Sequence, residues 1–178
     1  MIEIYRLLTR WWTAFALAIS LAMLGFAHAS ERFLGLSPCN LCLKQREVLW
    51  GAVAIAAVAT SWAVISRASR GTPRIAAFLL AMVFATGAVT ATLHFGGEMK
   101  WWALPATCSG GGASTDIESL TALALGTGPV IKVAMCDAVT WRFLGLSMAG
   151  WNVILSSALA IFSLLAAKRP KDARAPKP

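Results

Sequence analysis

Four long runs of apolar residues divide the chain, and each is long enough to cross the hydrocarbon core of a membrane. They cover residues 11–29, 48–66, 75–95 and 144–167, and a membrane-spanning helix needs about 20 mostly apolar residues. The runs are apolar on all sides instead of along one stripe, which is typical of helices surrounded by lipid. Because backbone amides in lipid must bond within their own segment, we predict an all-α membrane protein, a bundle of four transmembrane helices.

The segments between the runs predict how this single domain, residues 1–178, is organised. The connection at 67–74 is short, so the second and third helices should form an antiparallel pair. Outer loops at residues 30–47 and 96–143 then lie on the side opposite to the N-terminus and the tail at 168–178. The long loop contains Thr115 followed by Glu118, which is capping-box spacing, and then an apolar stripe. We therefore expect it to carry a short helix lying on the membrane surface.

The first run has a second interpretation, as a signal peptide that is removed. Arg6 and Arg10 precede it, and it ends in Ala27-His28-Ala29, which looks like a signal-peptidase site. However, the run exceeds the about 7–15 apolar residues usual in a signal peptide, and three further runs follow. These features favour a first helix that stays in the membrane.

The composition agrees with this architecture and excludes other classes. Of the 178 residues, 58% are hydrophobic and 13% are charged, and the mean hydropathy is +0.68. Soluble domains are about 45–50% apolar and about 25% charged. The balance excludes a disordered chain, a coiled coil and a disulfide-dense secreted miniprotein, and it disfavours a soluble enzyme.

The net charge of +8 lies entirely on one side of the predicted bundle. The side with the two chain ends and the 67–74 connection carries ten basic and two acidic residues, whereas the outer loops carry six of each. Cytoplasmic loops of membrane proteins are rich in Lys and Arg. We therefore place both termini in the cytoplasm, and no basic patch remains that would require a nucleic acid partner.

All four cysteines fall in the two outer loops. Cys39 and Cys42 lie in the first loop, and Cys108 and Cys136 lie in the second. The outer side of a membrane faces the oxidising compartment, where disulfides form and persist. This distribution points to disulfide chemistry and not to cysteines used as small buried apolar residues.

Cys39-Asn40-Leu41-Cys42 is a C-x-x-C motif placed just before a predicted membrane helix. Its spacing permits a vicinal disulfide, and a helix N-terminus together with a nearby cation stabilises a thiolate. Arg46 lies four residues after Cys42, so the two share a helix face. Arg46 could hold the Cys42 sulfur ionised close to a lipid-soluble acceptor, or it could simply be an anchor at the membrane interface.

Three uses of the cysteines remain open on the residues alone. A closed zinc site would need all four, but Cys108 and Cys136 lack the close spacing of a second ligand pair, so we expect no resident metal. Two purely structural disulfides would staple the outer loops. A relay would exchange disulfides between the loop pair and the C-x-x-C pair, and then deliver two electrons to a carrier in the bilayer.

Three motifs resemble the DsbB family of membrane thiol oxidases. LSPCNLCLKQR at residues 36–46 resembles the first outer loop of that family. HFGGEMKWWALPATC at 94–108 is similar to the exit of its third span and the first cysteine of its long loop. CDAVTWRFLGLSMAGWN at 136–152 is similar to the second loop cysteine and the entry to the last span. The motifs occur in the right order and on the right side of four spans.

The resemblance implies an enzyme that reoxidises a periplasmic DsbA-like thioredoxin-fold oxidase and passes electrons to ubiquinone or menaquinone in the bacterial inner membrane. By position, Cys108 would form the mixed disulfide with the partner and Cys136 would resolve it. Cys39 would accept the electrons, and Cys42 would face the quinone. Residues near the quinone would be Arg46, His94 and Glu98, the last standing where some members have Gln.

Other functions remain as alternatives. A related oxidase could serve a different dedicated thioredoxin-fold partner. Quinone-linked epoxide reductases share a four-helix bundle, but their redox C-x-x-C lies late in the chain, whereas here it lies in the first outer loop. A non-enzymatic membrane scaffold with stapled loops would contain no cysteine pair that a mild dithiol reduces.

Overall fold

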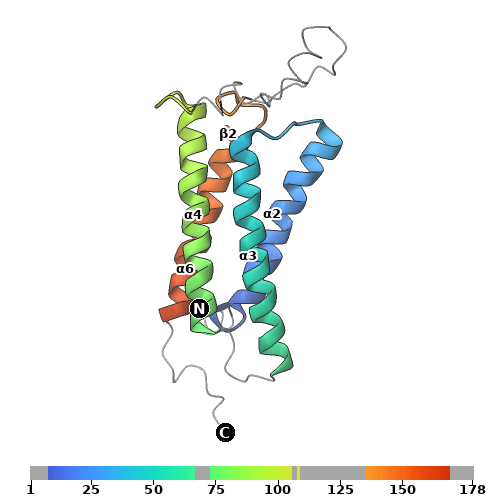
Figure 1. Ribbon diagram of the computed structural model, residues 1–178, viewed down its shortest axis with the longest axis vertical. Helices are drawn as coiled ribbons and strands as arrows, with labels where there is room; N and C mark the ends of the chain where they lie inside the picture. The colour runs from blue at the N-terminus through green and yellow to red at the C-terminus, as the bar shows by residue number, and fades with distance from the viewer. Residues whose placement is uncertain (1–7, 67–72, 106–107, 109–134, 169–178) are drawn as a thin grey trace, which may run out of the picture.

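Four long helices dominate the computed structural model, which describes residues 8–66, 73–105, 108 and 135–168. All four are long and apolar enough to cross a membrane, and they run alternately up and down the bundle (Figure 1). A short antiparallel hairpin of two strands precedes the last helix. The elements are α2 (Trp12–Leu34), α3 (Asn40–Ile65), α4 (Arg74–Glu98), β1 (Arg142–Phe143), β2 (Leu146–Ser147) and α6 (Met148–Lys168). The predicted all-α membrane bundle is confirmed.

Small residues line the interior of the bundle, and large apolar residues cover its outside. Ala52, Ala56 and Ala77 are fully buried around Phe84, while side chains such as Ile75 remain 76% exposed. Lipid tails are as apolar as these side chains, so helices in a membrane associate by close packing of small residues and not by removing apolar surface from water. The exposed apolar surface is therefore the surface expected toward lipid.

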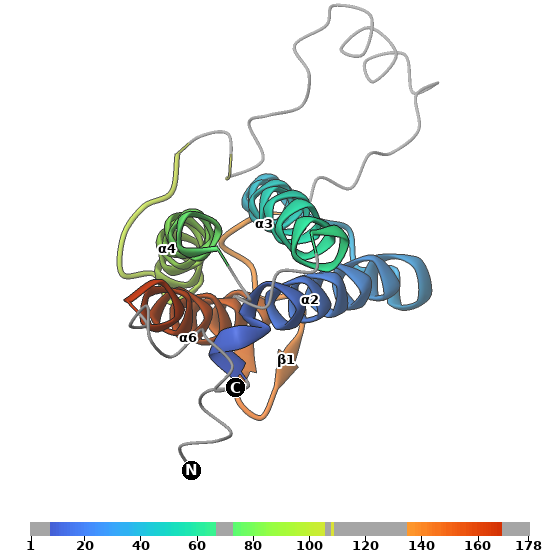
Figure 2. The same ribbon diagram turned by 90° about the horizontal axis from the view of Figure 1, so that it is seen from below.

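The helices do not contact one another equally. α4 packs along α6, α3 packs on α4, and α2 packs on α3. α2 and α6 meet at the end of the bundle where Trp12 donates a 2.9 Å hydrogen bond to Ser163 Oγ. Toward the other end α2 leans away from the bundle (Figure 1), and β1 lies between α2 and α6 (Figure 2). This divergence opens space beside α3 at the end that carries the cysteines.

The hairpin corrects the predicted start of the last span. Residues 144–147 were expected to be helical, but Leu144 and Gly145 have φ angles of 51° and 84°. Two consecutive residues with positive φ form the tight turn that suits an antiparallel hairpin. Arg142 pairs with Ser147 and Phe143 pairs with Leu146, so α6 begins only at Met148.

The helices around the first two cysteines are longer than the charge-free runs. α2 continues to Leu34 and α3 already begins at Asn40, so the predicted loop at 30–47 shrinks to residues 35–39. Four of the five charged residues in these extra turns are paired: Arg46 with Glu31, and Lys44 with Glu47. The spans were predicted from runs without charged residues, so each predicted span stops before the first charge. A helix continues past such residues near a membrane interface, where long charged side chains reach the water. The predicted surface helix after Thr115 lies outside the described residues.

Candidate functional site

The four cysteines gather at one end of the bundle. Cys39, Cys108 and Cys136 form a buried cluster, and Cys42 packs against it. Cys136 is 1% exposed, and its backbone N–H donates a 3.0 Å hydrogen bond to the carbonyl of Cys108. Thus residues that lie up to 97 positions apart in the sequence meet in one small volume.

Cys39 and Cys42 sit at the start of α3. Cys39 is the N-cap residue, and its Sγ accepts a 3.3 Å hydrogen bond from the backbone N–H of Cys42. The two Sγ atoms are 2.8 Å apart. The hydrogen bond with Cys42 Sγ, followed by burial, raises the pKa of the Cys39 thiol well above its usual range. Cys39 is therefore the sulfur of the pair that holds its proton.

The segment after α4 folds back over the end of that helix and leads toward Cys108. Trp102 donates a 3.1 Å hydrogen bond to the Leu93 carbonyl, and its ring covers Gly96 so closely that a Cβ there would clash with it. Leu104 covers Gly97 in the same way. The two glycines therefore leave room for the returning segment.

An ion pair holds the segments carrying Cys108 and Cys136 side by side. Lys100 Nζ lies 2.5 Å from Asp137 Oδ2, next to Cys136 in the sequence. The hydrogen bond from Lys100 lowers the pKa of the Asp137 carboxyl, so the acid stays charged at neutral pH. The Lys100 side chain is 66% exposed and the Asp137 side chain 35%, and ion pairs at the surface contribute little stability.

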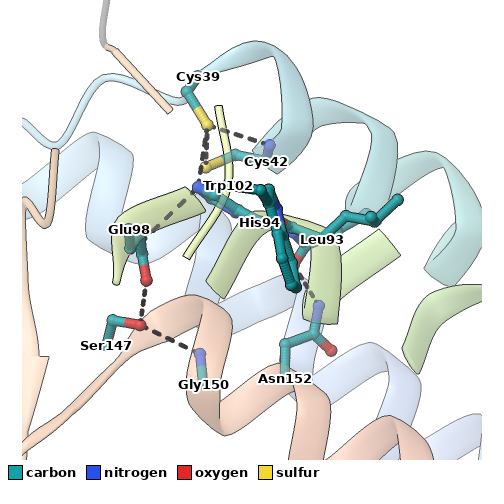
Figure 3. A network of polar contacts seen from close by, with 10 residues as sticks. Cys39, Cys42, Leu93, His94, Glu98, Trp102, Ser147, Gly150 and Asn152 are labelled. Atoms are coloured by element: carbon teal, nitrogen blue, oxygen red, sulfur yellow. Dashed lines mark hydrogen bonds and ion pairs between the residues drawn. The ribbon is translucent and has the colours of Figure 1, made fainter. Parts of the chain in front are cut away.

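His94 connects the Cys39–Cys42 pair to a chain of buried polar groups (Figure 3). Its Nε2 lies 3.6 Å from Cys39 Sγ, and its Nδ1 lies 3.0 Å from Gln45 Nε2. Gln45 Oε1 accepts a 2.5 Å hydrogen bond from Asn152, whose Oδ1 accepts a 2.9 Å bond from Ser156. The chain joins α3, α4 and α6, and each polar side chain in it has a hydrogen-bonding neighbour.

Sequence reasoning missed Gln45, Asn152 and Ser156. A signal was present, because Asn152 and Ser156 interrupt the last apolar run four residues apart and therefore share a helix face. Polar residues inside a membrane span are costly, and they usually face the bundle interior and mark a functional site. Gln45 gave no such signal, because the sequence analysis placed it in the outer loop at 30–47 and not in a span.

Glu98 faces His94 and also holds the hairpin. Its Oε1 lies 3.8 Å from His94 Nε2, and its Oε2 accepts a hydrogen bond from Ser147 Oγ (Figure 3). Ser147 Oγ in turn accepts a 3.1 Å bond from the backbone N–H of Gly150. Glu98 thereby joins the end of α4 to the start of α6, and its side chain is only 6% exposed.

Arg46 makes its hydrogen bonds to α2. Its guanidinium lies 2.5 Å from Glu31 Oε2 and donates a 3.0 Å bond to the Ala27 carbonyl. The cation is also close enough to act electrostatically on Cys42. Glu31 is a further residue that the sequence analysis did not single out, and its ion pair with Arg46 fixes the orientation of the guanidinium.

A cavity of about 420 Å³ adjoins the Cys39–Cys42 pair. Its polar lining includes Cys42, Arg46 and His94, and four aromatic rings close its sides. Those rings belong to Phe26, Trp141, Phe143 and Trp151, which contact one another in sequence from α2 through the hairpin to α6. A mostly apolar cavity with a few convergent polar groups is the usual form of a small-molecule site.

The comparisons with known proteins point to one family. The family model of the disulfide bond formation protein DsbB matches residues 9–166. A disulfide bond formation protein B from Marinobacter nauticus is 31% identical, covering 92% of this chain and 96% of its own. Another protein of that name, from Aromatoleum aromaticum, is 29% identical over 86% of this chain and 89% of its own. No solved structure matches. The chain is therefore a membrane disulfide bond formation protein that belongs to the DsbB family.

Proposed function

We propose that this protein is a dithiol:quinone oxidoreductase of the bacterial inner membrane. It reoxidises a periplasmic DsbA-like thioredoxin-fold oxidase and passes the electrons through Cys108 and Cys136, then Cys39 and Cys42, to ubiquinone or menaquinone. Both termini lie in the cytoplasm, and the cysteine end faces the periplasm. The observation that carries the proposal is the contact of a four-cysteine cluster with a cavity that Cys42 and Arg46 line.

The first exchange takes place between the partner and the loop pair. A thiolate of the reduced partner attacks Cys108 Sγ of a Cys108–Cys136 disulfide, and Cys136 leaves as a thiolate. The second partner thiol then attacks the mixed disulfide. The partner ends as a disulfide, and the loop pair ends as two thiols that hold the two electrons. The position of Cys136 beside Cys108 supports this assignment.

The second exchange moves the electrons to the C-x-x-C pair. The Cys136 thiolate attacks Cys39 Sγ of a Cys39–Cys42 disulfide, and Cys42 leaves as a thiolate. Cys108 then attacks Cys136, which restores the loop disulfide and leaves Cys39 and Cys42 reduced. Since the pKa of Cys39 is raised, Cys39 takes up the proton and Cys42 carries the charge. The helix N-terminus and the nearby Arg46 stabilise such a thiolate.

The residues around the cavity fit a quinone. Its apolar walls suit the ring and the isoprenoid tail, and two of the five N–H donors of Arg46 are occupied by Glu31 and Ala27, which leaves donors for a quinone oxygen. His94 lines the same cavity. A quinone supplies a two-electron acceptor beside Cys42. Such an acceptor is needed because a DsbA-type partner has a potential of about −120 mV, and a disulfide of ordinary, lower potential could not reoxidise it without a further oxidant.

The proposal is tested by following quinone absorbance under anaerobic conditions with the purified protein and a reduced DsbA-type protein as electron donor. We expect quinone loss in step with partner oxidation, and we expect it to require all four cysteines. If the partner is oxidised while no quinone is consumed, the acceptor is wrong. If neither reacts, a different thiol partner or a stapled scaffold is favoured, and trapping of free thiols after mild reduction distinguishes these two.

A further inference from the structure

Three side chains of the site offer metal-ligand atoms at close quarters. Cys39 and Cys42 each provide an Sγ and His94 provides an imidazole nitrogen, and these atoms all lie within 4.8 Å of one another. Cys39 and His94 are buried, and Cys42 is half-buried. We propose that the reduced Cys39–Cys42 pair and His94 form a binding site for a thiophilic divalent cation of the zinc type. The proposal requires only that the pair is reduced, whichever protein or reagent reduces it.

The spacing of the three atoms is close to that of a tetrahedral site. In a tetrahedral zinc site the metal lies about 2.3 Å from sulfur and about 2.0 Å from nitrogen. These bond lengths separate a sulfur and a nitrogen ligand by about 3.5 Å, and two sulfur ligands by about 3.8 Å. Cys39 Sγ already lies 3.6 Å from His94 Nε2. The two Sγ atoms are 2.8 Å apart, so Cys42 Sγ must move by about 1 Å. The cavity that Cys42 lines provides room for that movement.

The second nitrogen of His94 is already fixed, which is the usual arrangement around a metal-bound histidine. A ligating imidazole normally donates its other N–H to a neighbouring acceptor. Here Nδ1 lies 3.0 Å from the side-chain amide of Gln45. If the side-chain amides of Gln45 and Asn152 both turn over, Gln45 Oε1 faces His94 and accepts a hydrogen bond from a proton on Nδ1. Gln45 then donates to Asn152 Oδ1, and the Asn152 amide donates to the Ser156 hydroxyl, which at present donates to Asn152. His94 Nε2 then has a free lone pair aimed at the two sulfurs.

The fourth position and the charge balance both favour a bound cation. Three protein ligands leave one position open toward the cavity, where water completes a tetrahedron. Binding displaces the proton of the Cys39 thiol to the solvent, and Cys42 is already a thiolate, so two thiolates neutralise the two positive charges and no electrons are transferred. Glu98 adds a negative charge 3.8 Å from His94 Nε2. The nearest cation, Arg46, is paired with Glu31.

The site has a consequence for thiol chemistry. A metal-bound Cys42 thiolate is no longer free to attack an acceptor, and a metal-bound Cys39 is no longer free to pair with Cys42. Occupancy therefore holds the pair in its reduced form. A cation of this class becomes an inhibitor that acts on the reduced protein and not on the oxidised one.

The binding experiment uses the full-length protein in detergent, reduced with a phosphine that is then removed without oxygen. Zn²⁺ is titrated in competition with a chromophoric chelator, and Cd²⁺ is added in parallel to record thiolate-to-metal absorption. We expect one ion per reduced chain and binding at least about 100-fold weaker in the oxidised protein, because a disulfide offers no thiolate. Equal binding by the two redox forms would overturn the proposal.

Matched variants identify the ligands. His94→Ala should weaken Zn²⁺ binding by about 10–100-fold, whereas His28→Gln should leave it unchanged because His28 is exposed on α2. The double variant Cys108→Ser/Cys136→Ser should still bind one ion with full affinity. Loss of binding in this double variant, or unchanged binding in His94→Ala, would contradict the proposed ligand set.

A spectroscopic measurement keeps the test valid if His94→Ala misfolds. The chain contains two histidines, so ¹⁵N-histidine labelling gives two imidazole spin systems, and His28→Gln assigns them. Binding of Cd²⁺ should shift Nε2 of His94 strongly and leave the His28 ring unchanged. Tight stoichiometric binding without that shift would show a dithiolate site that lacks the histidine. The quinone assay plays no part in this result, so failure of either proposal is recognised separately.

Discussion

The two ends of the bundle are held together in different ways. Toward the end where Trp12 meets Ser163, the interior consists of alanines packed around Leu80 and Phe84, which are 0% exposed. At the cysteine end, the interior contains sulfur atoms and a chain of amide, imidazole and hydroxyl groups, and a cavity separates α2 from α6. The first end is held mainly by close packing, to which the Trp12–Ser163 hydrogen bond is added. The second end must satisfy every polar group, because an unpaired polar group in the membrane is expensive.

This difference separates stability from chemistry. An apolar interior of small residues brings helices close together and tolerates no void. A polar interior beside a cavity contributes less to packing, but it aligns reactive atoms. Substitutions at one end should therefore change the free energy of unfolding, whereas substitutions at the other should change rates and affinities.

The largest effect is expected at the C-x-x-C pair. Cys42→Ser should lower quinone reduction by roughly 1,000-fold or more, because serine cannot act as the thiolate nucleophile. Anaerobic quinone absorbance measures it. Cys108→Ser is the matched variant: it should abolish turnover with the protein partner but retain quinone reduction when a small dithiol reduces Cys39 and Cys42 directly. Equal loss with both donors in Cys108→Ser would contradict the order of the relay.

The next effect tests the apolar end. Phe84→Ala should lower the free energy of unfolding by about 3 kcal/mol, because it leaves a cavity in the fully buried core. Unfolding by a denaturing detergent, followed by circular dichroism, measures the change. Phe78→Ala on the same helix is the control, since Phe78 is 51% exposed and should change little. Turnover per folded molecule should be unchanged in both variants; a large loss of turnover in Phe84→Ala would remove the distinction between the two ends.

The reactivity of the two sulfurs tests the cysteine end more finely. The raised pKa keeps the Cys39 thiol protonated at neutral pH, and only the thiolate reacts with iodoacetamide. In the reduced protein at pH 7, we expect Cys42 to be alkylated about 30-fold faster than Cys39. Peptide mass spectrometry over time measures both. Equal alkylation rates of the two sulfurs at pH 7 would show that Cys39 is not the sulfur that retains the proton.

Much of this arrangement follows from the sequence, and the parts that do not follow share a physical reason. Four apolar runs predict four helices because lipid imposes one local rule on every residue of a span. The meeting of His94 with Gln45 and Asn152 depends on the rotation and depth of three separate helices, which local patterns do not encode. The pairing of Arg46 with Glu31 likewise depends on α2 continuing beyond its apolar run.

Arg46 tests whether that pairing serves the cavity. Arg46→Ala should raise the apparent KM for quinone about 10-fold, which corresponds to about 1.4 kcal/mol, while exchange between Cys108–Cys136 and the protein partner stays intact. Arg46→Lys should recover only part of the affinity, because an ammonium lacks the planar set of donors. Arg32→Ala is the control, since Arg32 is an exposed cation in the last turn of α2, next to Glu31, the residue that pairs with Arg46. Unchanged quinone affinity in Arg46→Ala would leave Arg46 as an interfacial anchor.

The smallest effect concerns the far end of the polar chain, where the two kinds of interior meet. Ser156 is 1% exposed and donates to Asn152, and a Cβ on Gly87 of α4 would lie 3.3 Å from its Oγ. Ser156→Ala should cost only about 1 kcal/mol of unfolding free energy, the net contribution of a typical intramolecular hydrogen bond. Ser157→Ala, on another face of α6, is the control for the substitution itself. Because Asn152 keeps its bond to Gln45, turnover should fall by less than about twofold. If turnover falls by much more than twofold, Ser156 must fix the donor and acceptor directions of the hydrogen bonds from Asn152 through Gln45 to His94. The residues that matter for chemistry would then reach deeper into the bundle than the cavity does.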